Sequence, residues 1–250
     1  MHHFFVSPEQ IDGEYVHITG SDVNHIKNVL RMKLSEELLI SNGQDKDYMC
    51  QIEAMSDDEI KARIIDSSYE GTELPCKIYL FQGLPKSDKM EMIIQKAVEL
   101  GAYSIIPVAT KRCVVKLDDK KQESKIKRWQ AISESAAKQS RRGIIPNIGN
   151  VMHFKEAIKM ASKMDMAIIP YENFKDMVET NRVMSSVTDA KEIAIFIGPE
   201  GGFEENEIDF ALENGVKPIS LGKRILRTET AGLAILSVLM FRLDVAKEDI

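Results

Sequence analysis

Two strand–loop–helix segments in tandem constrain the fold of this chain more than any other feature. Residues 194–197 are a short apolar run that predicts a buried strand, and the glycine-rich segment 198–202 follows it. An acidic helix is expected from about Glu204. Residues 218–221 predict a second short strand, and a second helix is expected from about Thr228. Both loops leave the carboxyl ends of their strands, which is the edge where open α/β sheets bind ligands.

The pattern changes near residues 67–75, a polar stretch with Gly and Pro. Before it, short alternating segments and one helix, capped by Ser21 or Asp22, predict a small β-barrel. The strands are expected at 4–6, 14–18, 38–41, 48–54 and 60–65, with a hairpin turn at Asn42–Gly43. After it, strands and helices alternate, which favours a mainly parallel sheet covered on both faces. We therefore predict an α/β chain with domains at 1–72 and 73–250.

The second domain has further expected elements on the amino-terminal side of the tandem segments. A helix capped by Ser87 or Asp88 follows the strand at 78–81, with Glu91 placed to complete a capping box. A strand at 104–109, a basic helix at 122–139 with Trp129 turned into the core, a helix at 153–164 and a strand at 166–169 come next. That last strand ends in a loop at the same sheet edge, so three loops are expected to converge on one pocket.

The charge of the chain is unevenly distributed. The formal net charge is −6, but residues 111–145 hold eleven Lys or Arg and four Asp or Glu, a local balance of +7. A basic stripe of this size is a candidate contact for RNA phosphates. The other reading is a solvated amphipathic helix with a lysine-rich outer face, and composition alone leaves the two about equal.

Several function classes have no support in the sequence. There is no G-x-x-x-x-G-K-[ST] segment for a P-loop and no G-x-G-x-x-G after the first strand of the second domain. The His, Cys and carboxylate residues have no metal-site spacing, so we expect no metal. The three cysteines are far apart and are expected to be reduced. The longest apolar run is too short for a membrane span, and no signal peptide is recognised, so a cytoplasmic protein is expected.

The predicted pocket combines glycines with apolar side chains. Ile197, Leu221, Ile225 and Leu226 lie beside the glycine loops, and such a lining suits a ligand that carries a purine.

The same residues carry a resemblance. The strings G-P-E-G-G-F at 198–203 and L-G-K-R-I-L-R-T-E-T-A at 221–231 resemble the signature of the RsmE family of SPOUT methyltransferases. The resemblance extends to L-P-K-x-D-K-M-E at 84–91, to Lys111–Arg112 and to the segment at 133–142 before Pro146, so it covers essentially the whole chain. It implies a PUA-like RNA-binding barrel, a SPOUT domain with a trefoil knot, and a homodimer.

The resemblance also implies a reaction and a set of site residues. The reaction is methylation by S-adenosylmethionine of N3 of a uridine, the family's uridine 1498, in 16S rRNA of the 30S subunit. The cofactor-binding residues are Ile169, Pro170, Tyr171, Glu172, Ile197, Gly198, Pro199, Glu200, Gly201, Gly202, Leu221, Gly222, Ile225, Leu226, Arg227 and Thr228. Candidate RNA contacts are Lys27, Arg31, Lys86, Arg112, Arg141 and Arg142, with Lys27 and Arg31 on one helix face.

The catalytic candidates are Arg227, Arg224 and Glu200. The two arginines suit negative charge that develops on the uracil oxygens. Glu200 or Glu229 could accept the N3 proton, but a structural role in the loop is favoured for both. A ribose 2′-O-methyltransferase with the same fold, and an RNA-binding assembly factor without catalysis, are the alternatives.

Two positions depart from the family pattern. His3 stands ahead of Phe4–Phe5 where the family commonly has an arginine, and a histidine could replace that charge only in part. Ser87 stands where glycine is usual.

Overall fold

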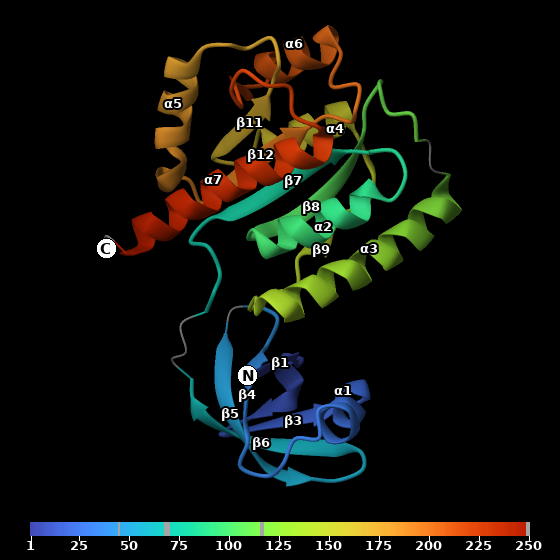
Figure 1. The fold of residues 1–250 in the computed structure, drawn as a ribbon, viewed down its shortest axis with the longest axis vertical. Helices are drawn as coiled ribbons and strands as arrows, with labels where there is room; N and C mark the ends of the chain where they lie inside the picture. Colours follow the sequence, from blue (N-terminus) through green and yellow to red (C-terminus); the bar gives the residue numbers. More distant parts are fainter. Residues whose placement is uncertain (45, 68–70, 116–117, 249–250) are drawn as a thin grey trace. The chain divides into compact units, whose positions relative to one another are not determined.

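The computed structural model describes residues 1–44, 46–67, 71–115 and 118–248, and the chain divides into two compact units (Figure 1). The first unit contains Met1–Glu73 together with Ala137–Ile145, and the second contains Leu74–Ala136 with Pro146–Ile250. The predicted domain boundary, between residues 72 and 73, lies next to the point between Glu73 and Leu74 at which the chain first passes from the first unit to the second. No pattern in the sequence predicts that residues 137–145 return to the first unit.

The first unit is built on one six-stranded sheet. Its strands are β1 (His2–Phe5), β2 (Ile11–Asp12), β3 (Tyr15–Thr19), β4 (Glu37–Ser41), β5 (Asp47–Met55) and β6 (Glu59–Asp66). The order is β1-β4-β5-β6-β3-β2, with β1 parallel to β4 and every other pair antiparallel. No pairing joins β1 to β2 among the described residues, so the sheet is curled but open, and the predicted small β-barrel is corrected to a half-barrel.

A short helical segment covers the core of this unit. It consists of α1 (Ser21–Asn24) and the π-helical turn η2 (His25–Val29), whereas the separate turn η1 (Pro8–Gln10) lies between β1 and β2 and buries no residue. Val23 and Ile26 are buried in a core with Ile18, Leu38 and Ile60, as their spacing predicts. The helix ends before Arg31, whose φ of 54° is in the left-handed region. The expectation that Lys27 and Arg31 share a helix face was therefore wrong.

The second unit is a parallel sheet with helices on both faces. Its strands are β7 (Lys77–Gly83), β8 (Ala102–Ala109), β9 (Asn147–Ile148), β10 (Met152–His153), β11 (Met166–Pro170), β12 (Glu192–Ile197) and β13 (Lys217–Ile219). The order is β10-β8-β7-β12-β11-β13, with β9 also paired to β8. The helices are α2 (Lys89–Glu99), α3 (Asp119–Ser140), α4 (Phe154–Ala161), α5 (Met177–Ser185), η3 (Val187–Asp189), α6 (Glu205–Glu213) and α7 (Thr228–Glu248). Helix α5 was not predicted.

The alternation of side chains along the strands explains the two layers of helices. Phe81, Phe196 and Ile106 face α4 and α6, and the rings of Phe81 and Phe196 stack with centroids 4.6 Å apart. The alternate positions face the other way, where α2 packs against α7 (Figure 1). Trp129 is 3% exposed, which confirms it as a core residue.

The order of strands brings the site loops together. β12 lies between β7 and β11, and β11 pairs with β13, so the loops after β11, β12 and β13 leave one edge of the sheet. The expected capping box of α2 is absent, because Asp88 makes no side-chain cap and the Glu91 carboxylate bonds to Arg128 at 2.8 Å. The trefoil knot stays a prediction.

Candidate functional site

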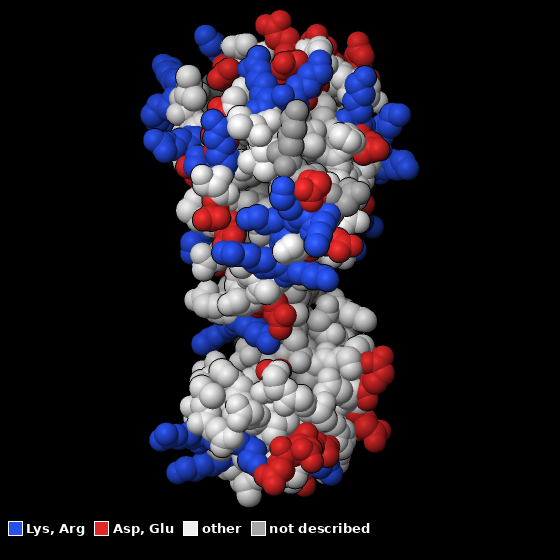
Figure 2. Space-filling view, turned by 90° about the vertical axis from the view of Figure 1, so that its right-hand side faces the viewer, with Lys and Arg blue, Asp and Glu red and all other residues white. Residues whose placement is uncertain are grey.

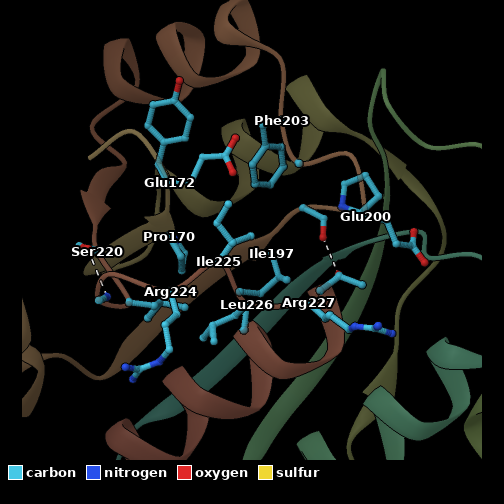
Figure 3. Close-up of a pocket in the computed structure, with 18 of the residues that line it drawn as sticks. Pro170, Glu172, Ile197, Glu200, Phe203, Ser220, Arg224, Ile225, Leu226 and Arg227 are labelled. Atoms are coloured by element: carbon cyan, nitrogen blue, oxygen red, sulfur yellow. Dashed lines mark hydrogen bonds between the residues drawn. The ribbon is translucent and has the colours of Figure 1, made fainter. Parts of the chain in front are cut away.

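A pocket of about 440 Å³ opens at the carboxyl edge of the parallel sheet (Figure 3). The loops after β11, β12 and β13 supply most of its walls, and Lys89 of α2 and Ala231 of α7 complete it. Its volume lies within the range typical of sites for small organic ligands. The convergence of three loops on one pocket, expected from the strand pattern, is therefore found in the structure.

Close packing of backbone against backbone shapes the glycine-rich loop. A Cβ on Gly198 would lie 3.0 Å from the Cα of Gly202, and the Gly202 N–H donates to the Pro199 carbonyl at 2.9 Å. A Cβ on Gly83 would lie 2.6 Å from Cδ of Pro199. Side chains at positions 83 and 198 would push the loop out of place, which explains glycine there.

A lysine between two carboxylates ties this loop to the helices. Lys89 Nζ lies 3.0 Å from Glu200 Oε1 and 3.3 Å from Glu229 Oε2. The backbone N–H of Lys86 also donates to Glu200, at 3.1 Å to Oε1. Burial opposes ionisation of Glu200, but hydrogen bonds from its own backbone, Lys89 and Lys86 hold its pKa below the ordinary value. The hydrogen bond to Glu200 in turn raises the pKa of Lys89.

Two arginines line the pocket, and their guanidinium groups have no partner among the described residues. Within the described part of the chain, neither Arg224 nor Arg227 makes an ion pair or hydrogen bond through its guanidinium, and both residues are exposed. Their side chains extend to either side of Leu226, with Arg227 on the side of Glu200 (Figure 3). Ile225, between the loops, is 85% exposed. Cations that are free in this way are available to an anionic ligand or to RNA.

Most of the residues expected from sequence to hold a cofactor line this pocket, but two do not. Ile169 is fully buried in β11, and Gly201 faces Arg112, whose Nη1 donates to the Gly201 carbonyl at 2.9 Å. The pocket has further lining residues that the sequence did not assign to the cofactor, namely Lys89, Phe203, Ser220, Lys223 and Ala231. The sequence does carry a signal for Lys89, because a lysine at a helix start opposes the helix dipole unless a phosphate or carboxylate lies near it.

The basic residues expected to contact RNA have unequal surroundings in the structure. Arg31 and Lys86 are exposed, whereas Lys27 Nζ bonds to the Ser56 carbonyl at 2.6 Å and to Asp57 at 2.9 Å. Arg112 is exposed but holds the glycine loop as described. On the view in Figure 2, basic side chains lie among acidic ones rather than in an unbroken field. Lys116, counted in the basic stretch, lies outside the described residues.

Arg142 was expected to contact an RNA phosphate, and this expectation is corrected because the residue is buried. It is 4% exposed, and its guanidinium donates to both carboxylate oxygens of Glu73, whose Oε1 also accepts the Gly143 N–H at 3.0 Å. A buried arginine held by a carboxylate cannot also bind a phosphate at the surface. Arg141, beside it, is exposed and has a φ of 58°.

His3 is buried rather than presented to a partner. It is 8% exposed, its Nε2 lies 2.6 Å from the Ser41 hydroxyl, and that hydroxyl donates to Asp47. Burial, with the nearby charges of Lys138 and Arg141, lowers the pKa of His3 to about 4. Its ring is therefore neutral at neutral pH and does not replace an exposed arginine.

Among the described residues, no three His, Cys, Asp or Glu side chains are grouped so that they could hold a metal ion. None of the described helices is long and apolar enough to cross a membrane.

Comparison with known proteins gives matches over nearly the whole chain. Residues 72–240 match the model of an RNA methyltransferase domain, and residues 18–65 match that of an RNA methyltransferase PUA domain. Ribosomal RNA small subunit methyltransferase E of Bacillus subtilis is 37% identical over 235 residues, 93% of this chain and 92% of that one. The protein of the same name from Mesomycoplasma hyopneumoniae is 33% identical over 95% and 98% of the two chains.

A solved structure agrees with these matches. The crystal structure of a ribosomal RNA small subunit methyltransferase E from Neisseria gonorrhoeae, bound to S-adenosyl methionine, superposes with a TM-score of 0.81. It is 30% identical to this chain, and the alignment covers 97% of this chain and 98% of that one.

Proposed function

Because this chain belongs to the ribosomal RNA small subunit methyltransferase E family, we propose that it methylates N3 of one uridine, uridine 1498, of 16S rRNA with S-adenosylmethionine. The observation that carries the proposal is the pocket itself. It combines a glycine loop, apolar side chains and two free arginines at the sheet edge, in a fold shared with a protein that binds this cofactor.

The pocket residues fit the cofactor. Its volume suits a nucleoside-sized ligand, its apolar lining suits the adenine ring, and its glycines let a ligand approach the backbone. We propose that the cofactor contacts are Pro170, Tyr171, Glu172, Ile197, Gly198, Pro199, Glu200, Gly202, Leu221, Gly222, Ile225, Leu226, Arg227 and Thr228, with Phe203 and Ser220 added. Ile169 and Gly201 are dropped because they do not line the pocket. When bound, the cofactor supplies an activated methyl group.

Arg227 is proposed to stabilise the reacting base. Loss of the N3 proton leaves negative charge on the uracil oxygens, and a fixed guanidinium beside them lowers the energy of that charge. Arg227 lies on the side of the pocket that Glu200 forms, and no described residue neutralises it (Figure 3). Arg224, on the opposite side of Leu226, is proposed as a second cation that holds the RNA in place.

We assign no carboxylate as the proton acceptor. Glu200 and Glu229 are both engaged by Lys89, and the pKa of Glu200 is held low, so that Glu200 is a weak base. Their positions favour the structural role that the sequence also favoured, and the N3 proton is proposed to pass to water before the methyl group is transferred. Positioning of the methyl carbon in line with N3 then supplies much of the acceleration.

The partner assembly is the small ribosomal subunit, reached in the cytoplasm, and the chain is proposed to act as a homodimer. Helix α7 carries Val238, Phe241 and Val245 on its surface, which are 47%, 68% and 44% exposed. An apolar surface of this kind is typical of protein interfaces. RNA contacts are proposed for Arg31, Lys86, Arg112 and Arg141, with Lys27 held by Asp57 as a weaker candidate.

The test is methylation of small subunits that lack the modification. Protein, labelled S-adenosylmethionine and 30S subunits are incubated, and the digested RNA is analysed by nucleoside mass spectrometry. We expect 3-methyluridine. A 2′-O-methylated nucleoside would overturn the assigned target atom and keep the fold. Absence of any methylation, with no cofactor binding by calorimetry, would leave an RNA-binding factor instead.

A further inference from the structure

The amide of Gln82 connects the end of β7 to two walls of the pocket. Gln82 is fully buried, and its Nε2 lies 2.9 Å from the Gly83 carbonyl and 2.9 Å from the Thr228 hydroxyl. The Thr228 hydroxyl lies 2.5 Å from the Gly198 carbonyl. Three segments far apart in the sequence therefore share one short chain of hydrogen bonds.

The direction of this chain of hydrogen bonds is fixed by chemistry. A carbonyl only accepts, so the Gln82 atom beside the Gly83 carbonyl is the amide nitrogen. That nitrogen donates to Thr228, which leaves the Thr228 proton for the Gly198 carbonyl. Gln82 donates to both of its partners, and the Thr228 hydroxyl accepts from Gln82 and donates to Gly198. The opposite orientation of the amide would place its oxygen against the Gly83 carbonyl, so that two acceptors would meet.

The cost of burying this amide supports a role beyond core packing. Gln82 Oε1 is buried and has no hydrogen-bond partner among the described residues. An unsatisfied buried acceptor is destabilising, and an apolar side chain of the same length would avoid it. The amide is thus poorly explained by stability alone.

The two residues at the far end of the chain of hydrogen bonds both line the pocket. Gly198 begins the glycine loop, and Thr228 begins α7 directly after Arg227. The neighbour of Gln82, Gly83, packs against Pro199 so closely that a Cβ would lie 2.7 Å from the Pro199 nitrogen. Strand β7 therefore supports the loop from behind through both packing and hydrogen bonding.

We infer that Gln82 is a positioning residue for the cofactor pocket, acting through Thr228 on the Gly198 carbonyl and on the start of α7. This inference rests on the proposed function. Thr228 then serves the pocket by holding Gly198, because its hydroxyl already donates one hydrogen bond and accepts another.

The experiment compares cofactor affinity and stability in a set of variants. Gln82→Met removes the amide with little change in length, Thr228→Val removes the hydroxyl with no change in shape, and Thr228→Ser keeps it. S-adenosylmethionine binding is measured by calorimetry, and folding by thermal unfolding. Gln130→Met is the matched control, because Gln130 also uses its amide within this unit, bonding to the Pro146 carbonyl and the Ile148 N–H away from the pocket.

Gln82→Met and Thr228→Val should each weaken binding roughly three- to tenfold, the size of one lost hydrogen bond. The double variant should be no weaker than the single ones, because both act through one chain of hydrogen bonds. Thr228→Ser should bind within about twofold of the parent, and Gln130→Met should lose stability only.

Unchanged affinity in folded Gln82→Met, or losses that multiply in the double variant, would overturn the inference while the proposed function stands. A parent protein that binds no S-adenosylmethionine would overturn both. If Gln82→Met does not fold, the comparison of Thr228→Val with Thr228→Ser decides, because only loss of the hydroxyl should weaken binding.

Discussion

Lys89 Nζ lies 3.0 Å from Glu200 Oε1 and so fastens the glycine loop after β12 to the first turn of α2. The same carboxylate accepts the backbone N–H of Lys86. The Glu200 carboxylate therefore joins two segments that are more than a hundred residues apart in the chain. Because it is already bound to these two donors, a role as a free base is disfavoured.

Removing the Glu200 carboxylate should make the glycine loop of the pocket less rigidly held. We expect Glu200→Ala to weaken S-adenosylmethionine binding by roughly tenfold, because one carboxylate holds two donors. Calorimetry at pH 7 measures it, and Glu99→Ala, which removes the Lys96–Glu99 pair at the far end of α2, is the control with unchanged affinity. Because the pKa of Glu200 is lowered from 4.5, its contacts with Lys89 and Lys86 should persist at pH 4.5 and be lost only as pH falls through the lowered pKa. Full affinity in Glu200→Ala would contradict this role.

The two pocket arginines should separate into different kinetic effects. Arg227→Ala should lower kcat about 10²- to 10³-fold, as loss of a group that stabilises developing charge does. Arg224→Ala should chiefly raise KM for the 30S substrate. Single-turnover and steady-state rates measure the two, with Arg182→Ala as a control, because Arg182 is exposed on α5 and pairs only weakly with Glu179 at 3.4 Å. Equal effects of both changes on kcat would count against the assignment.

The pH dependence of the reaction tests whether a carboxylate takes the proton. If the uridine loses its N3 proton to water, the single-turnover rate should rise about tenfold per pH unit from pH 6 to pH 8. A carboxylate base with a lowered pKa, such as Glu200, is fully ionised across that range and would give a flat profile. A flat profile in the parent protein that collapses in Glu200→Gln would restore Glu200 as the base.

The sequence predicted the parallel sheet and its loops well because their cause is local. Apolar runs followed by glycine, at the ends of β12 and β13, mark buried strands and the turns that follow them. The pairing of Arg142 with Glu73, by contrast, joins residues 69 apart, and no local pattern shows that the segment after α3 returns to the first unit. Gln82 was missed for the same reason, since its partner Thr228 is 146 residues away.

The position of Ser87 makes a prediction about stability. Its φ of 58° is in the left-handed region, which explains why glycine is usual there and costs a serine about 1–2 kcal/mol. After the extra unfolded-state entropy of glycine, Ser87→Gly should stabilise the protein by about 0.5–1 kcal/mol. Ser135→Gly, at an exposed position inside α3, should destabilise by about 0.5 kcal/mol. Denaturant unfolding measures both, and a loss of stability in Ser87→Gly would contradict the strained turn.

The buried histidine predicts a dependence of stability on acid. His3 has a pKa of about 4 in the fold against 6.5 as its ordinary value, so the folded state binds fewer protons than the unfolded state between these values. The free energy of unfolding should therefore fall as pH drops from 6.5 to 4, by an amount on the order of 2–3 kcal/mol.

Asp47 beside it works in the opposite direction. Burial raises its pKa, so stability from Asp47 is present at low pH and is lost as pH rises through the raised value. The other charges that face this cluster are Lys138, Arg141 and Glu73.

The contribution of His3 is isolated by His3→Gln, whose amide can still bond to Ser41. Unfolding free energies of the two proteins, measured at several pH values, should converge as pH falls toward 4. A constant difference across that range would show that His3 does not titrate with folding.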